Sequence, residues 1–351
     1  MGKIPKTMCG VVLLGHGGPE MLQYRDDLPV PHPHDGEVLI RVAAAGVNNT
    51  DINTRTAWYS KGDQDSGDAS WSGQALHFPR IQGADVCGAI VEVGDGVERT
   101  RIGERVLIEP CIRESRGHLL ETPWYFGSEC DGGFADYATV AARHAYPVES
   151  PLSSLELASF PCSYSTAENM LTRTGARDYE VVLITGASGG VGSAAIQLAK
   201  ARGAYVIAVT SPTKADDLRG IGADKVILRG DDYAETLGQN SVDVVIDLVG
   251  GPQWGGLLEV LRPHGRYGVS GAIGGPLVEL DIRTLYLKDL SFFGCTVLEP
   301  DVFANLVTHI NDGRIVPLIA ETYPIQQIAE AQASFGKKTH IGKIVLQVDR
   351  T

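Results

Sequence analysis

A glycine-rich segment between an apolar run and a helical stretch limits the fold of this chain more than any other feature. Residues 181–192 read VVLITGASGGVG, and the helix-favouring residues 193–202 follow directly. Glycines let the backbone turn sharply, and the N-terminus of the following helix offers unpaired N–H groups and a favourable dipole. The pattern predicts a strand, a tight turn and a helix that together seat the pyrophosphate of a dinucleotide.

The residues around this segment alternate between short apolar runs and helical stretches, which is typical of a parallel sheet covered by helices. Strands are expected at 181–185, 205–209, 225–228, 242–248, 265–270 and 290–294. Helices are expected at 192–202, 214–220, 233–239 and 254–261. Six strands in this arrangement predict a doubly wound Rossmann fold.

The end of the second strand bears on the choice between the two nicotinamide dinucleotides. An NAD-selective site usually has Asp or Glu there, whereas this chain has Thr210, followed by Ser211, Thr213 and Lys214. A 2′-phosphate could accept hydrogen bonds from these hydroxyls and a charge-assisted one from the lysine. We therefore expect NADPH, although Lys214 could also simply begin a solvated helix.

The rest of the chain has a different pattern. Short strands are expected at 37–43, 89–93, 105–108, 135–140 and 342–347, and a helix at 325–335. The first and last parts of the chain should thus form one β-rich, barrel-like domain with the nucleotide domain inserted in its sequence. Two polar stretches, 60–77 and 112–128, lack periodicity and are expected to be lids or disordered loops.

Composition excludes several classes of protein. A net charge of −13 without a basic cluster argues against nucleic acid as a partner. No apolar run approaches the roughly 20 residues that a membrane span needs, and the N-terminus lacks a signal-peptide core. The six cysteines are dispersed, so we expect no disulfides and a cytoplasmic location.

Several short motifs together resemble the medium-chain dehydrogenase/reductase superfamily over nearly the whole chain. They are GADVCG at 83–88, GERV at 103–106, CDGGFADY at 130–137, the glycine-rich turn and GKIV at 342–345. The resemblance implies an α/β fold in which a Rossmann doubly wound parallel sheet is inserted in a β-rich, GroES-like barrel domain. It implies a catalytic domain at 1–163, a cofactor-binding domain at 164–297 and the catalytic domain's C-terminal part at 298–351.

The zinc-dependent members of this superfamily hold their catalytic metal with two cysteines and a histidine. The matching positions here are Asn48, Ala84 and Cys162, and an amide with an alanine cannot replace a thiolate and an imidazole. The superfamily's structural-zinc lobe uses four cysteines, whereas the comparable stretch has only Cys111 and Cys130. We therefore expect no metal at either place.

The segment GVNNTDI at 46–52 resembles the zinc-independent quinone oxidoreductases and 2-enoyl reductases. In mitochondrial-type enoyl reductases a tyrosine thought to protonate the substrate follows the asparagine by eleven residues, which here is Tyr59. The resemblance implies that Asn48 orients substrate or nicotinamide ribose and that Tyr59 or a water donates a proton. Thr50 is a secondary candidate, and Asp51 is expected to be a turn or cap residue. Tyr59 could equally be a packing residue at the mouth of the cleft.

The expected cofactor site combines the glycine-rich turn with residues that the resemblance implies. Thr166 matches a threonine that contacts nicotinamide, and Lys343 matches a lysine near the cofactor. The full expected set is Thr166, Gly186, Ala187, Ser188, Gly189, Gly190, Val191, Thr210, Ser211, Lys214, Val249, Ser270 and Lys343.

These observations predict a zinc-independent, NADPH-dependent enzyme that transfers hydride to a quinone or an α,β-unsaturated carbonyl, with small enones and quinones preferred to acyl-CoA. One alternative is an alcohol or aldehyde dehydrogenase with an unusual zinc site around Asp85 and Cys162. Another is an NADPH-binding protein with little turnover. A homodimer joined at the edge strand near 290–296 is expected, although a tetramer is possible.

Overall fold

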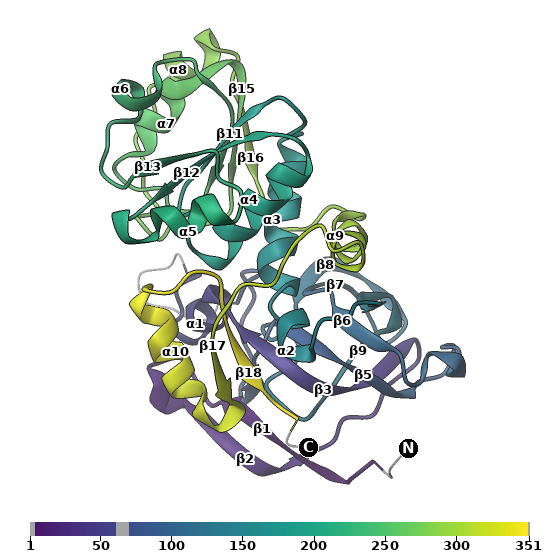
Figure 1. Cartoon of the computed structure of the whole chain (residues 1–351). Coiled ribbons are helices and arrows are strands. Elements are labelled where there is room, and N and C mark those ends of the chain that lie inside the picture. The colour runs from purple at the N-terminus through teal and green to yellow at the C-terminus, as the bar shows by residue number, and fades with distance from the viewer. Residues whose placement is uncertain (1–3, 61–69, 350–351) are drawn as a thin grey trace. The chain divides into compact units, whose positions relative to one another are not determined.

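The computed structural model describes residues 4–60 and 70–349 (Figure 1). The chain divides into two compact units. The first unit comprises residues 1–162, 310–313 and 317–351, and the second comprises 163–309 and 314–316. The domain boundaries at 163/164 and 297/298 stay a prediction, and in the observed division residues 298–309 group with the second unit.

The second unit contains a six-stranded, fully parallel sheet with the strand order β13-β12-β11-β14-β15-β16. The strands are β11 (Val181–Ile184), β12 (Tyr205–Thr210), β13 (Lys225–Leu228), β14 (Val242–Asp247), β15 (Leu261–Val269) and β16 (Ser291–Gly294). The strand order reverses between β11 and β14, which is the place where doubly wound sheets bind ligands. The predicted Rossmann-type sheet is therefore confirmed.

Helices cover both faces of this sheet. The helices of this part of the chain are α3 (Pro161–Arg173), α4 (Gly190–Ala201), α5 (Ala215–Gly220), α6 (Tyr233–Leu237), α7 (Trp254–Val260), α8 (Ile282–Leu287) and α9 (Val302–Asn311). Figure 1 shows α4 and α5 on one face and α6, α7 and α8 on the other. The strands β11, β12 and β14 are mostly apolar and buried, which explains why the sequence there reads as short hydrophobic runs.

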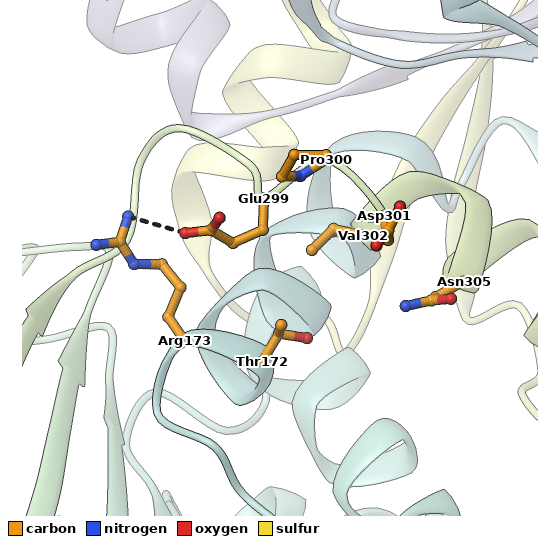
Figure 2. Close-up of a pocket in the computed structure, with 7 residues that line it drawn as sticks. All are labelled: Thr172, Arg173, Glu299, Pro300, Asp301, Val302 and Asn305. Carbon is orange, nitrogen blue, oxygen red and sulfur yellow. Dashed lines mark ion pairs between the residues drawn. The ribbon is translucent and has the colours of Figure 1, made fainter.

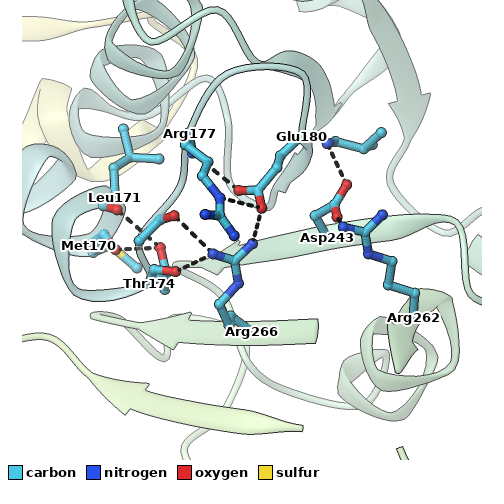
Figure 3. Close-up of polar contacts among 10 residues, drawn as sticks. Met170, Leu171, Thr174, Arg177, Glu180, Asp243, Arg262 and Arg266 are labelled. Carbon is cyan, nitrogen blue, oxygen red and sulfur yellow. Dashed lines mark hydrogen bonds and ion pairs between the residues drawn. The ribbon is translucent and has the colours of Figure 1, made fainter. Parts of the chain in front are cut away.

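Charged side chains hold the region around the start of β11 (Figure 3). The carboxylate of Glu180 accepts hydrogen bonds from Arg266 (2.6 Å) and from the side chain of Arg177 (3.2 Å). Asp243 accepts the Val181 N–H at 2.8 Å and pairs with Arg262. These contacts lie near the amino ends of β11 and β14, so they leave the carboxyl ends available for a site.

The first unit is built around a seven-stranded sheet with the order β10-β6-β5-β3-β18-β17, in which β9 also pairs with β3. Its strands are β3 (Glu37–Val47), β5 (Asp85–Val93), β6 (Arg105–Ile108), β9 (Tyr137–Ala141), β10 (Ala145–Pro147), β17 (Ile319–Pro324) and β18 (Lys343–Gln347). The long strand β3 pairs with β5, β9 and β18, so the C-terminal strand closes a sheet formed by the N-terminal part.

The remaining elements of the first unit surround this sheet. They are β1 (Thr7–Leu13), β2 (Leu22–Pro29) and β4 (Arg80–Ile81) in a three-stranded sheet, the hairpin β7 (Cys111–Ser115) and β8 (His118–Tyr125), and the helices α1 (Asn49–Arg55), α2 (Ser154–Leu157) and α10 (Ile328–Lys337). The β-rich character predicted for this part of the chain is confirmed.

The hairpin β7–β8 corrects one expectation, because residues 112–125 form paired strands and not an irregular loop. Most β8 side chains are exposed or half-buried, so the strand has no hydrophobic alternation to reveal it. The buried Glu109 accepts hydrogen bonds from His144 Nδ1 and Arg113, both at 2.8 Å, and this cluster supports the base of the hairpin. Of the other polar stretch, 60–77, residues 61–69 lie outside the described part of the chain.

Two further expectations concern the whole chain. All six cysteines are free thiols in the structure. Within residues 4–60 and 70–349, no helix is long and apolar enough to cross a membrane.

Candidate functional site

The turn between β11 and α4 has the geometry of a phosphate cradle. Gly186 has a φ of +57°, a left-handed conformation that favours glycine, and Gly189 is the N-cap of α4. The N–H of Gly189 donates to the carbonyl of Gly186 at 3.0 Å, which closes the turn. The first N–H groups of a helix lack acceptors within the helix, so an anion can bind there.

Gly192 lets α4 lie directly against this turn. A Cβ at this position would lie 2.4 Å from the carbonyl oxygen of Gly186 and 2.6 Å from the Cα of Ala187. Both are backbone atoms that cannot rotate away. Any larger residue would therefore push the helix N-terminus away from the turn and widen the cradle.

The residues predicted to bind a 2′-phosphate lie at the carboxyl end of β12. The Thr210 hydroxyl is buried and has no hydrogen-bond partner among the described residues. The Lys214 ammonium is 3.4 Å from the Ser188 hydroxyl, so the lysine reaches back to the glycine-rich turn. Ser211 and Thr213 contact each other through their hydroxyls at 3.2 Å. A buried hydroxyl without a partner and an ammonium that reaches the glycine-rich turn both suit an anionic ligand.

A second cation in this place was missed in the sequence. Arg229 follows β13, which pairs with β12, and its N–H donates to the carbonyl of Thr210 at 2.8 Å. Burial lowers the pKa of Lys214, and the positive charge of Arg229 lowers it further. The sequence shows only that Arg229 directly follows the predicted strand 225–228, and the pairing of β13 with β12 is what places it beside Thr210.

A fully buried carboxylate fixes the loop on the other side of the turn. Asp247 accepts hydrogen bonds from the hydroxyls of Thr185 (2.5 Å) and Tyr267 (2.6 Å) and from the N–H of Val249 (2.9 Å). A Cβ on Gly186 would lie 3.2 Å from the Val249 side chain, so the two loops are close neighbours. Asp247 therefore positions Val249, one of the predicted cofactor residues.

A second polar cluster lies in the first unit, which we call the lysine hub: Asn48, Asp85, Cys162 and Lys343. The Lys343 ammonium is 2.7 Å from the Asp85 carboxylate and also donates to the amide oxygen of Asn48. The amide nitrogen of Asn48 donates to Asp85 at 2.8 Å, and the N–H of Cys162 donates to it at 2.5 Å. Both ends of the Asn48 amide are thus bonded within the protein.

Two aromatic side chains pack beside the hub. Tyr125 forms a 3.0 Å hydrogen bond with the Cys162 sulfur, and its ring stacks on Trp71 with centroids 4.9 Å apart. Both rings pack with Ala84 and Cys162 in a small apolar cluster. Burial and the charge of Asp85 raise the pKa of Cys162 to about 12, so this cysteine is a neutral thiol at physiological pH.

The predicted proton donor lies on the segment after α1. The Tyr59 hydroxyl donates to Thr50 Oγ1 at 3.2 Å, so the structure brings these two predicted residues together. Burial raises the pKa of Tyr59, which keeps the phenol protonated. Asp51 accepts the N–H of Asn48 at 2.8 Å and caps α1, as expected of it. Burial raises the pKa of Asp51 to about 7.

The predicted residues fall into two groups. Asn48, Thr50, Tyr59 and Lys343 belong to the first unit, where the lysine comes from a strand far along the sequence. The second unit contains the other group, which is the turn 186–191 together with Thr166, Thr210, Ser211, Lys214, Val249 and Ser270. Thr166 is half-buried on α3, and Ser270 follows β15. In the structure, Lys343 contacts Asn48 and Asp85. The role of Lys343 toward the cofactor stays a prediction.

A separate surface pocket of about 400 Å³ lies in the second unit between the end of α3 and the start of α9 (Figure 2). Its lining is Thr172, Arg173, Glu299, Pro300, Asp301, Val302 and Asn305. Arg173 and Glu299 form a loose ion pair of 3.7 Å across it. None of the predicted site residues lines this pocket.

Comparisons with known proteins agree with this architecture. The family "Alcohol dehydrogenase GroES-like domain" matches residues 34–150, and the family "Zinc-binding dehydrogenase" matches residues 190–312. The acryloyl-coenzyme A reductase of Metallosphaera sedula is 30% identical over 97% of this chain and 99% of its own length. The quinone oxidoreductase of Rattus norvegicus is 30% identical over 97% of this chain and 98% of its own length.

A solved structure is also closely similar. The candidate alcohol dehydrogenase of Sinorhizobium meliloti superposes with a TM-score of 0.91 at 46% identity, covering 99% of this chain and 98% of that one. The chain therefore belongs to the medium-chain dehydrogenase/reductase superfamily, in its branch of quinone oxidoreductases and 2-enoyl reductases. It is an oxidoreductase whose Rossmann-type domain binds a nicotinamide cofactor.

One family name implies zinc, and the side chains of this chain do not fit that metal. The three positions that would carry the zinc ligands are Asn48, Ala84 and Cys162. The Asn48 amide is bonded to the Lys343 ammonium, and the Cys162 thiol is bonded to the Tyr125 hydroxyl. Zinc prefers thiolate, imidazole and carboxylate ligands. Among the residues that the structure describes, no three His, Cys, Asp or Glu side chains converge so as to hold a metal ion.

We predict that Gly192→Val weakens binding of the dinucleotide at least about tenfold, because the added side chain collides with the turn and displaces the helix N-terminus that faces the pyrophosphate. Quenching of protein fluorescence on titration with NADPH measures the affinity. Gly255→Ala, on an exposed part of α7 with open space around it, is the matched control and should leave binding unchanged. Equal affinities for the two variants would contradict the role of Gly192.

Proposed function

We propose that this protein is a zinc-independent, NADPH-dependent oxidoreductase that reduces a quinone or an α,β-unsaturated carbonyl compound. The observation that carries the proposal is the lysine hub, because it fills the place of the metal ligands with a bonded network. The names of the two relatives, a quinone oxidoreductase and an acryloyl-coenzyme A reductase, support this class of acceptor.

The glycine-rich turn and the first turn of α4 would hold the pyrophosphate, while Ser188, Thr210, Lys214 and Arg229 would hold the 2′-phosphate. Thr166, Val249 and Ser270 are proposed to contact the cofactor as well. When bound, the reduced nicotinamide supplies a hydride. The turn that Gly192 tightens and the buried Thr210 hydroxyl are the features that fit this ligand.

Reduction of a conjugated C=C bond leaves negative charge on the acceptor's oxygen and requires a proton at its α-carbon. We propose that Tyr59 donates this proton, since its raised pKa keeps the hydroxyl protonated at neutral pH. Thr50, hydrogen-bonded to Tyr59, orients the phenol. Asn48 is proposed to orient this segment, because its amide is bonded to Asp85 and Lys343.

We predict that the protein oxidises NADPH in the presence of small quinones or enones. Tyr59→Phe should lower turnover about 100-fold with NADPH affinity unchanged, because only the proton donor is lost. Absorbance at the nicotinamide band measures the rate. Tyr179→Phe, at a tyrosine that is 92% exposed, is the control.

The same assay separates the alternatives. Unchanged turnover in Tyr59→Phe would remove the tyrosine from the mechanism. Tight NADPH binding without turnover on quinones, enones or enoyl thioesters would favour an NADPH-binding protein. One equivalent of zinc in the untagged protein, together with alcohol oxidation, would favour a zinc-type dehydrogenase.

The choice of NADPH has its own test. Removing both cations in a Lys214→Ala, Arg229→Ala variant should weaken NADPH binding by at least about 100-fold, since charge-assisted hydrogen bonds to the 2′-phosphate contribute about 1.5–3 kcal/mol each. NADH affinity should change little. Arg219→Ala, an exposed cation on α5 paired with Asp216, is the control. Parallel losses for NADPH and NADH would contradict a 2′-phosphate site.

We also propose a homodimer joined at β16. This strand is the edge of the six-stranded sheet, and exposed apolar side chains precede it in residues 273–287. A second copy can pair with the same edge around a twofold axis, which covers both strands at once. The exposed members are Ile273, Leu277, Val278, Leu280, Ile282, Tyr286 and Leu287, together with Phe292 of β16.

A cytoplasmic location likewise stays a prediction.

Sedimentation velocity should therefore give twice the mass of one chain, and Leu277→Asp, at a side chain that is 90% exposed, should shift the protein toward monomer because it places a charge in the apolar contact. Leu119→Asp, at an exposed leucine of the hairpin β7–β8, is the control. A wild-type monomer at micromolar concentration would rule the dimer out.

A further inference from the structure

The ion pair at the centre of the lysine hub is almost completely removed from solvent. The Lys343 side chain is 2% exposed and that of Asp85 is 0% exposed. Burying two charges is costly, so such a pair is stable only where further hydrogen bonds complete it. Here Asn48 bonds to both partners and the N–H of Cys162 bonds to Asp85.

The hub connects three segments that are distant in the sequence. Asn48 precedes α1, Asp85 begins β5 directly after Ala84, and Cys162 lies in the first turn of α3. These are the segments on which zinc-dependent members of the superfamily carry their metal ligands. In this chain the ammonium of Lys343, from the C-terminal strand β18, meets the amide and the carboxylate there.

We propose that Lys343 is the resident cation of this site, takes over the structural place of the metal, and acts through Asn48 as a positioning residue for the proton donor. Its ammonium neutralises Asp85 and fixes the plane of the Asn48 amide. The Asn48 N–H is bonded to Asp51 of α1, and α1 carries Thr50, which contacts Tyr59. The orientation of the phenol thus depends on the lysine through a continuous set of bonds.

The surroundings explain why a cation is needed at this point. Asp51 is buried near Asp85, and the repulsion between the two carboxyl groups adds to burial in raising the pKa of Asp51. Without Lys343 the Asp85 charge would have no cation in this cluster, and the Asn48 oxygen would lose the ammonium that donates to it. The Asn48 amide, which lies directly before α1, would then keep its bond to Asp85 but lose the one that ties it to β18.

The structural part of the proposal is tested by thermal unfolding of the full chain. Lys343→Met and Asp85→Asn should each lower the melting temperature on the order of 10 °C, because each leaves an unpaired buried charge. The double variant should recover at least half of the loss. Lys338→Met is the control, because this exposed lysine also donates to an asparagine, Asn49. Single variants no less stable than the control, or strictly additive losses, would overturn the proposal.

The positioning role of Lys343 rests on the proposed function. It is tested by the turnover of the Lys343→Met, Asp85→Asn double variant, which is expected to regain thermal stability. Its turnover at saturating NADPH should fall about tenfold, and this loss should vanish when Tyr59→Phe is added, since coupled residues are non-additive. An equal loss with and without Tyr59 would overturn the positioning role. Absence of any turnover in the wild type would refute the proposed function and leave the unfolding result to decide on the hub.

Metal analysis provides an independent check. Wild-type protein dialysed against zinc and then against buffer should retain less than about 0.1 equivalent, because the hub offers one thiol beside an amide and an alanine, fewer groups than the three protein ligands of a catalytic zinc site. Stoichiometric zinc that is lost in Cys162→Ser would show that the ion displaces the ammonium, and it would overturn the proposal.

Discussion

The close contact between α4 and the turn after β11 determines how the second unit can bind a ligand. Gly192 lets the helix lie against the backbone of Gly186 and Ala187, so the helix N-terminus faces the same space as the turn. The Asp247 carboxylate fixes the neighbouring loop through Thr185 and Val249. These contacts join the carboxyl ends of β11 and β14, so the sheet fixes the positions of the turn and of the loop beside it.

The first unit meets a different constraint, which is the need to hold three distant segments together without the ligands that a metal requires. The lysine hub does this with one ammonium and one carboxylate, and with an amide that bonds to both. Family membership alone would have suggested zinc, since one matching family is described as zinc-binding. The side chains at the matching positions do not form a set of zinc ligands, which agrees with the general rule that the chemistry of a site can vary within one fold.

The sequence predicted the strands of the parallel sheet well where a run of apolar residues coincides with a buried strand. The strands β11, β12 and β14 are mostly apolar and buried, and five of the six parallel strands begin within one residue of the predicted start. It failed for the hairpin β7–β8, because a two-stranded ribbon with most β8 side chains exposed or half-buried leaves no periodic signal. It also missed Arg229, because a single basic residue after a strand has meaning only when the neighbouring strand is known.

The sequence by itself determined the cradle, because the residues of a glycine-rich turn and its helix are adjacent in the chain and their conformation is local. It also determined which metal ligands are missing, since that depends on residue identity alone. Only the tertiary structure decided that Lys343 bonds to Asn48 and Asp85, and that Arg229 follows the strand beside Thr210. Such contacts depend on strand pairing across hundreds of residues, which local propensity does not encode.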